Sequence, residues 1–248
     1  MFKEMRIVAI IQARMGSSRL PGKVLKKLDD IPVLEHVVRR LSFSDLIDDI
    51  IVATSKKNKD DEIQNWGIKN GVKVFRGSET DVLNRFYNCS EKYIGDVICR
   101  ITADCPLVDY KLIDLEIKEL VKSKLDYVNF DTNQIPRGLN GEIFTKETLD
   151  IVHKNTKQNY YREHVTYYIY EKNEQEFDIK YIKPPEFLLK PDYRLTLDTE
   201  ADYKLLEKIF TELYVADGYL DLKSVISYLN KNEDMIEINA NVNQKSPK

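Results

Sequence analysis

The chain has 248 residues and a formal net charge of −3, with 38 Lys and Arg interspersed among 41 Asp and Glu. This balance excludes a strongly basic surface for nucleic acid or an anionic membrane, and no apolar run approaches the ~20 residues of a membrane span. The three cysteines and three histidines show no zinc-ligand spacing, which fits a reducing compartment. We expect a cytoplasmic protein with no membrane or nucleic-acid partner.

The first half of the chain alternates apolar β-branched runs with amphipathic segments. Strands are predicted at 7–11, 50–53, 72–75 and 96–101, and helices at 32–41, at 60–70 and from residue 82 onward. Strands separated by helices at this spacing form right-handed βαβ units. The fold class predicted is therefore α/β, with a Rossmann-like and mostly parallel sheet.

The second half begins with a strand at 125–130 and then loses its clear pattern. Thr145 is predicted to cap a helix, and a tyrosine-rich helix follows at 160–173. Further strands are predicted at 177–182 and 193–197, followed by two helices. Residues 131–192 read as an inserted lobe, and its tyrosines suggest a subunit interface. We expect one domain over residues 1–240 and a polar tail over 241–248.

A basic loop, residues 13–23, follows the first strand. It carries Arg14, Arg19 and Lys23 together with two glycines and two serines. Such a loop at the carboxyl end of a strand suits phosphate, because backbone N–H groups and cations converge there. The spacing fits neither a P-loop nor a GxGxxG motif. The pattern therefore indicates another kind of phosphate loop or, alternatively, a basic surface loop.

Aspartates end two predicted strands. Asp104 follows the strand at 96–101, and Asp198 follows the strand at 193–197. A carboxylate at such a position is costly to bury unless it is paired or holds a metal, so both are candidate Mg²⁺ ligands. Asp104 could instead cap the next helix, although Asp109 is better placed for that. With Arg14 and Lys23 neutralising charge, the combination favours attack on a nucleotide α-phosphorus.

Five segments resemble a known family. They are IIQARMGSSRLPGKVL from residue 10, RGSETDVLNRF (76–86), RITADCPL (100–107), REHVT (162–166) and RLTLDTEAD (194–202). Together they resemble the cytidylyltransferases that activate acylneuraminate and 3-deoxy-manno-octulosonate, and they are most similar to the spore-coat polysaccharide branch. The resemblance covers residues 5–215 in order. It implies a GT-A-like sheet, CTP, Mg²⁺ and a homodimer built through the inserted lobe.

The resemblance also implies roles for individual residues. Arg14, Ser17 and Lys23 would bind the CTP phosphates, and the backbone of Ala13 would contact the cytidine. Arg76, Ser78 and Arg85 would line the nucleotide pocket, Asp104 and Asp198 would hold Mg²⁺, and Arg162, Glu163 and His164 would face the acceptor. Two alternatives stay open: Arg85 could be an exposed arginine paired with Glu79 or Asp81, and His164 could be a helix-face histidine without a role.

One departure from the family pattern falls where the acceptor is expected. The close branch carries Gly-x-Asp-Val-Glu, whereas this chain has Gly138-Leu139-Asn140-Gly141-Glu142. Asn140 and Glu142 are therefore candidate acceptor contacts with a changed preference. The function predicted is transfer of CMP from CTP to an acidic sugar for a surface polysaccharide. Alternatives are the same chemistry on a phosphate or phosphonate acceptor, a metal-dependent glycosyltransferase, or a non-catalytic nucleotide-binding module.

Overall fold

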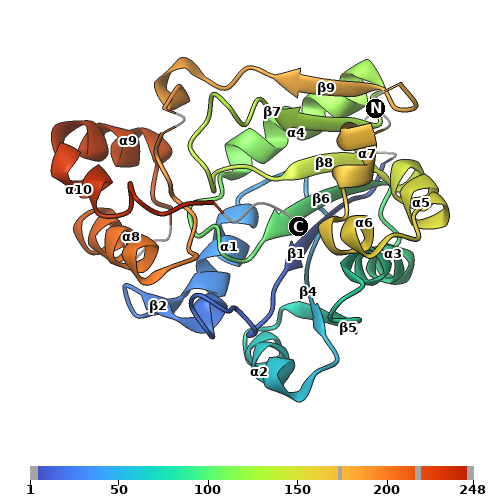
Figure 1. Cartoon of the computed structure of the whole chain (residues 1–248), viewed down its shortest axis with the longest axis horizontal. Helices are drawn as coiled ribbons and strands as arrows, with labels where there is room; N and C mark the ends of the chain where they lie inside the picture. The colour runs from blue at the N-terminus through green and yellow to red at the C-terminus, as the bar shows by residue number, and fades with distance from the viewer. Residues whose placement is uncertain (1–4, 173–174, 191, 216–218, 245–248) are drawn as a thin grey trace.

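A seven-stranded sheet forms the centre of the computed structural model, which describes residues 5–172, 175–190, 192–215 and 219–244 (Figure 1). The strands follow the spatial order β5-β4-β1-β6-β8-β7-β9. Their bounds are β1 (Ile7–Gln12), β4 (Asp49–Ser55), β5 (Lys73–Gly77), β6 (Val97–Thr102), β7 (Tyr127–Phe130), β8 (Glu142–Thr145) and β9 (Ile179–Ile182). All neighbouring pairs are parallel except the two that involve β8. The predicted α/β class and mostly parallel sheet are confirmed.

Helices cover both faces of this sheet. They are α1 (Val33–Leu41), α2 (Asp61–Lys69), α3 (Val82–Tyr93), α4 (Tyr110–Ser123), α5 (Lys146–Asn155), α6 (Asn159–His164), α7 (Tyr167–Lys172), α8 (Glu200–Leu213), α9 (Leu222–Lys231) and α10 (Glu233–Glu237). Short elements complete the described chain: η2 (Lys23–Leu25), β2 (Lys27–Leu28), β3 (Ile31–Pro32), η3 (Asn58–Asp60) and η4 (Glu186–Leu188). None of the described helices is both long and apolar enough to cross a bilayer.

Strand β1 shows why the sheet is buried on both sides. Ile7, Ala9 and Ile11 pack with residues of α1, α2 and α4, whereas Val8 and Ile10 pack with residues of α3, α5 and α7. Side chains alternate between the two faces of a strand, so a strand covered on both faces needs an unbroken apolar run. A third apolar cluster joins α8, α9 and the loops around Leu195 and Leu197 at one side of the sheet (Figure 1).

The structure differs from the prediction in two elements. Residues 193–197 form no sheet strand, because Arg194 makes an isolated bridge to Arg137 while Leu195 and Leu197 pack in a cluster with residues of α8. The expected tyrosine-rich helix is broken into α6 and α7 at Val165, whose φ of 49° is left-handed. The predicted cap is present, since Thr145 Oγ1 accepts a hydrogen bond from the N–H of Thr148. Residue 173, at the end of the expected helix, lies outside the described residues.

The segment 131–192 contributes directly to the central sheet. It supplies β8, which lies between β6 and β7, and β9 at the sheet edge. Strand β8 was not expected from the sequence, and it runs antiparallel to both neighbours. Helices α5, α6 and α7 remain outside the sheet; α5 and α6 lie beside α3, and α7 lies next to α6 (Figure 1). Because β8 and β9 belong to the central sheet, the lobe predicted for residues 131–192 is reduced to these helices and the loops of that segment.

Candidate active site

The basic loop folds back on itself directly after β1. The N–H of Gly22 and the N–H of Ser17 both donate to the Met15 carbonyl, at 3.0 Å each, and Asp60 Oδ1 accepts from the N–H of Met15 at 2.8 Å. Gly22 has a φ of 70°, so the tight return favours glycine there. Within the described residues, no hydrogen bond uses the N–H groups of Gly16, Ser18 or Arg19. Free N–H groups beside cations form a concavity suited to an anion.

This loop forms one wall of a cavity of about 220 Å³. The lining residues are Gln12, Arg14, Ser17, Ser18, Arg19, Lys23, Val24, Thr102, Asp104 and Asp198. Gln12 and Thr102 are register partners at the carboxyl ends of β1 and β6, which places the cavity at that edge of the sheet. The side chain of Arg14 is exposed and has no hydrogen-bond or ion-pair partner among the described residues. It is therefore free to meet an anion.

Lys23 joins the two strand-end aspartates. Its Nζ donates to Asp198 Oδ1 at 2.8 Å and also pairs with Asp104 Oδ2. Burial alone would lower the pKa of Lys23, but the two carboxylates outweigh it and raise that pKa above its usual 10.5. Burial likewise disfavours the charge on Asp198, but Lys23, with Arg19 and Arg194, lowers its pKa below the usual 3.8. Two carboxylates thus converge on one cationic position.

A divalent cation fits this carboxylate pair. Mg²⁺ is usually held by one or two carboxylates and completed by substrate phosphates and water. Asp104 and Asp198 already share the ammonium of Lys23, so they are close enough to share an ion. No group of three or more His, Cys, Asp or Glu in the described part of the chain could hold a metal by itself. The arrangement suits a metal that arrives with a phosphate ligand.

A larger cavity of about 1050 Å³ opens on the other side of the aspartates. It shares Arg19, Thr102, Asp104 and Asp198 with the smaller one. Its wall also includes Arg100, Asn129, Asp131, Asn133, Arg137, Asn140, Glu142, Glu171, Gln244 and five tyrosines at 127, 160, 167, 170 and 181. Arg137 is exposed there, and no carboxylate of the described residues pairs with its guanidinium. A ligand in the large cavity and one in the small cavity would meet at the aspartates.

Asn140 and Glu142, the candidate acceptor contacts in the segment that differs from the family pattern, lie in the wall of the large cavity. Glu142 pairs with Arg100 and accepts from the hydroxyls of Tyr127 and Thr166, each at 2.8 Å. Asn140 Nδ2 donates to Asn129 Oδ1 at 2.6 Å. The wall is thus held in place by neutral amides and one ion pair.

Gly141, the residue after Asn140, lies against β6. A Cβ at this position would lie 2.9 Å from the Arg100 carbonyl and 2.5 Å from Ile101 Cδ1. The valine of the close family pattern would therefore not fit here without displacing β6 or its own segment.

The three expected nucleotide-pocket residues after β5 are held by internal contacts. The guanidinium of Arg76 donates to the Ser55 and Lys57 carbonyls and to Gln64, and pairs with Asp61. Ser78 Oγ accepts from the N–H of Asp81 at 3.0 Å, and its carbonyl accepts from Arg85 Nη1 at 2.6 Å. None of the three lines either cavity in this conformation.

Arg85 is nevertheless unusual, because it is fully buried and mostly unpaired. Its relative exposure is 0 %, and its Nε and Nη2 have no hydrogen-bond partner among the residues that the structure describes. Burial, with the nearby charge of Arg14, lowers the pKa of Arg85 to about 10. The alternative of an exposed arginine paired with Glu79 or Asp81 is therefore wrong. A buried cation that lacks an anion is costly, so the position favours a negatively charged ligand nearby.

Arg162, Glu163 and His164 lie on α6, outside the lining of the large cavity. Arg162 Nε pairs with Asp81 at 2.7 Å, Glu163 is exposed, and the His164 ring stacks on Tyr167 with centroids 5.0 Å apart. Their contact with an acceptor stays a prediction. Tyr160 of α6 and Tyr167 of α7 do line the large cavity.

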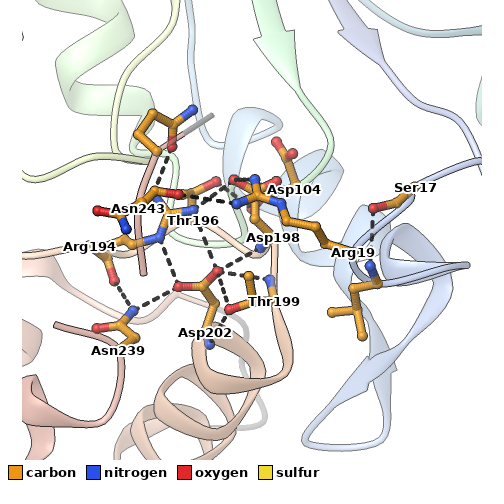
Figure 2. Close-up of polar contacts among 12 residues, drawn as sticks. Ser17, Arg19, Asp104, Arg194, Thr196, Asp198, Thr199, Asp202, Asn239 and Asn243 are labelled. Atoms are coloured by element: carbon orange, nitrogen blue, oxygen red, sulfur yellow. Dashed lines mark hydrogen bonds and ion pairs between the residues drawn. The ribbon is translucent and has the colours of Figure 1, made fainter. Parts of the chain in front are cut away.

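Several residues that the sequence reasoning did not single out also belong to the site. Arg194 donates to Asp198 Oδ2 at 2.7 Å, and the fully buried Asp202 holds Arg194 through its Nε at 2.9 Å (Figure 2). The Thr-x-x-Asp spacing of Thr199 and Asp202 is a capping-box signal that could have revealed Asp202. No local pattern indicates that Asn239, far along the chain, reaches the same cluster.

Comparison with known proteins shows the family of the chain. A family model described as cytidylyltransferase matches residues 8–231, which is most of the chain. The chain belongs to the cytidylyltransferase family. This cytidylyltransferase is 49% identical over 98% of both chains to the uncharacterized protein MJ1063 of Methanocaldococcus jannaschii. It is 37% identical, over 92% of this chain and 95% of the other, to the spore coat polysaccharide biosynthesis protein SpsF of Bacillus subtilis.

A solved structure supports both the family and the fold of this cytidylyltransferase. The cytidylyltransferase of Leptospira borgpetersenii superposes with a TM-score of 0.85 at 31% identity, covering 98% of this chain and 100% of the other. The resemblance drawn from the five sequence motifs is confirmed, including its spore-coat branch.

Proposed function

We propose that this cytidylyltransferase transfers CMP from CTP to an acidic sugar or a related small-molecule acceptor and releases pyrophosphate. The observation that carries the proposal is the pair of cavities that share Asp104 and Asp198. The small cavity has the basic loop and the dimensions for a triphosphate. The large cavity has room for the acceptor. Their junction is where the α-phosphorus would be attacked.

The cations have distinct parts in this proposal. Nucleotidyl transfer depends mainly on positioning and on neutralising charge that develops on the leaving oxygen. Arg14, Ser17 and Lys23 would bind the phosphates, with Arg14 and Lys23 stabilising the departing pyrophosphate. Ala13 would contact the cytidine through its backbone. Buried Arg85 would supply positive charge beneath Arg14, and Arg76 and Ser78 would hold the segment that frames the nucleotide.

Mg²⁺ would be held by Asp104 and Asp198, and it would neutralise the phosphate oxygens and lower the barrier to displacement. Lys23 occupies the space between these carboxylates. We therefore expect its ammonium to turn toward the phosphates once a nucleotide and its ion are bound. Lys23 would then leave its two carboxylate partners and pair with the anionic phosphates of the nucleotide.

The acceptor would lie in the large cavity. The unpaired guanidinium of Arg137 suits a carboxylate, phosphate or phosphonate. Asn140 and Glu142 would offer an amide and a carboxylate to hydroxyl groups, and the tyrosine wall would cover a sugar ring. Arg162, Glu163 and His164 could reach the acceptor only if α6 moved. SpsF takes part, by its name, in spore coat polysaccharide biosynthesis, which supports an acceptor destined for a surface polysaccharide.

We also propose that residues 1–240 act as one nucleotidyltransferase domain that pairs as a homodimer through α5, α6 and α7. The family resemblance supports this pairing. The tyrosines do not support it independently, because Tyr161 is buried and Tyr160, Tyr167 and Tyr170 line the large cavity.

The proposal is tested by incubating the protein with CTP, Mg²⁺ and a panel of acidic sugars, sugar phosphates and phosphonates. Pyrophosphate release and a CMP adduct detected by mass spectrometry are expected with CTP and one class of acceptor. An adduct with a phosphate or phosphonate would keep the chemistry and change the acceptor. Discharge of a nucleotide sugar without pyrophosphate release would favour a glycosyltransferase and contradict the proposal.

A further inference from the structure

The two oxygens of the Asp198 carboxylate lie in different surroundings. Oδ1 accepts from Lys23 Nζ at 2.8 Å and faces the side shared with Asp104. Oδ2 is paired with two guanidinium groups, those of Arg194 at 2.7 Å and Arg19 at 3.1 Å (Figure 2). The arginines therefore fix one oxygen and direct the other toward the shared cationic position. A carboxylate bound in this way cannot rotate freely.

Arg194 is itself held by a buried partner. Asp202 Oδ1 accepts from Arg194 Nε at 2.9 Å, while Asp202 Oδ2 accepts from the N–H groups of Asp198 and Thr199 at 3.0 and 2.9 Å. Asp202 thus holds the backbone of Asp198, and it also holds the Arg194 guanidinium that donates to the Asp198 side chain. The capping box at the start of α8 holds Asp202 in place.

The fourth member of this cluster comes from the C-terminal segment, residues 239–244. Asn239 is 3 % exposed, and its Nδ2 donates to Asp202 Oδ1 and to the Arg194 carbonyl, at 2.9 Å each (Figure 2). Farther along, the Asn243 carbonyl accepts from Arg19 at 3.3 Å, and Gln244 Oε1 accepts from Arg194 Nη1 at 2.7 Å. The segment runs from α10 toward the centre of the molecule (Figure 1), and Gln244 reaches the wall of the large cavity.

We propose that two residues of the C-terminal segment, Asn239 and Gln244, are positioning residues of the active site, which hold Asp198 through Arg194 and Asp202. The inference rests on the proposed function, in that Asp198 is taken to meet Mg²⁺ and CTP. Asn239 and Gln244 do not line the small cavity, so their effect on nucleotide binding passes through Arg194 and Asp202 to Asp198. Losing either side chain leaves the contacts of the basic loop in place and lets the Asp198 carboxylate turn away from the position it shares with Asp104.

The test compares CTP affinity by calorimetry in Mg²⁺ and in EDTA, so that the metal-linked gain in affinity is measured separately from phosphate binding. Asn239→Ala removes both hydrogen bonds of the amide. It should reduce the metal-linked gain about tenfold while affinity in EDTA stays within about twofold of wild type. Asn243→Ala is the matched control. Asn243 contacts Arg19 through its backbone carbonyl, which alanine keeps, so this variant should behave as wild type.

Gln244→Ala gives a second variant on an exposed residue, where folding is not at risk. It should reduce the same gain about twofold to threefold, and it decides the matter if Asn239→Ala does not fold. An unchanged metal-linked gain in the folded variants would overturn the inference. An equal loss in Mg²⁺ and in EDTA would also overturn it, because that pattern indicates a merely structural role. Absence of CTP binding by wild type would instead overturn the proposed function, and the inference with it.

Discussion

Lys23 Nζ donates a hydrogen bond to Asp198 Oδ1 at 2.8 Å, although 175 residues separate them along the chain. The same ammonium pairs with Asp104. One cation therefore joins the basic loop after β1, the turn after β6 and the loop before α8. Removing the Lys23 ammonium should therefore lower both the stability of the ligand-free protein and its rate of nucleotidyl transfer.

Lys23→Met should destabilise the ligand-free protein by about 1–3 kcal/mol at pH 7, because two neighbouring carboxylates lose their shared cation. Because the pKa of Asp198 is lowered in the folded protein, its ion pair contributes stability that is fully present above about pH 3.8. That stability is lost as the pH falls through the pKa of Asp198 in the folded protein. Because the pKa of Lys23 is raised in the folded protein, its ion pairs contribute stability that is fully present below about pH 10.5. That stability is lost as the pH rises through the pKa of Lys23 in the folded protein.

Thermal unfolding of wild type and Lys23→Met from pH 3 to 11 checks this. The difference in Tm should be level between about pH 5 and 9 and should narrow at both extremes. A difference that grows toward acid pH would show that the ion pair is not what the substitution removes.

Asp104→Asn and Asp198→Asn should each lower turnover by at least about 100-fold, because each leaves one ligand at the position proposed for Mg²⁺. The folded protein should tolerate Asp104→Asn, since an amide oxygen can still accept a hydrogen bond from Lys23. Asp198→Asn should also lower stability, because its amide nitrogen must face either Lys23 or the two guanidinium groups. Steady-state pyrophosphate release measures the effect. Asp61→Asn, which alters a half-exposed partner of Arg76, is the control and should retain near wild-type turnover.

Arg85→Met should stabilise the free protein by about 1–3 kcal/mol while weakening CTP binding. It removes a buried charge of which two nitrogens have no partner in the described part of the chain. Arg76→Met provides the contrast, because Arg76 has four polar partners and its loss should destabilise the protein. Urea denaturation and CTP calorimetry separate the two effects. A destabilised Arg85→Met protein would mean that Arg85 is satisfied by contacts beyond its bond to Ser78.

Gly138→Ala should destabilise the protein by about 3 kcal/mol or more. Gly138 has a φ of 101°, and a Cβ there would lie 2.7 Å from the Leu195 carbonyl. The added methyl group would push apart the bridge between Arg137 and Arg194. Gly71→Ala is a matched control, because Gly71 also has a positive φ, of 67°, but open space around it, and it should lose only about 1 kcal/mol. Equal losses in urea denaturation would rule out the steric explanation.

The sequence predicted the parallel half of the sheet well because its signals are local. The run Ile7–Ile11, buried on both faces, and the glycine after α2 act within a few residues. Strand β8 escaped prediction because only four residues form it. Its pairing with β6 is also a long-range contact, which no pattern within these four residues signals. The loop around Leu195 has the composition of a strand, but its leucines bury against helices rather than in a sheet.

The site was predictable to the extent that it follows strand ends. Arg14, Lys23, Asp104 and Asp198 follow β1, β6 or a strand-like run, and the structure brings Lys23 and both aspartates into contact. The capping pattern of Thr199 and Asp202 could have predicted Asp202. Asn239 could not have been predicted, because a single asparagine in a polar stretch carries no signal of a contact with Asp202, 37 residues away.

The central claim is that the edge of the sheet between the basic loop and the two aspartates binds CTP with a divalent cation. Calorimetric titration of wild type with CTP, UTP, ATP and GTP, each in Mg²⁺ and in EDTA, tests it directly. The account predicts that CTP binds most tightly and that Mg²⁺ strengthens its binding at least tenfold. Preference for another nucleotide would contradict the cytidine assignment, and failure to bind any nucleotide would contradict the account of the basic loop itself.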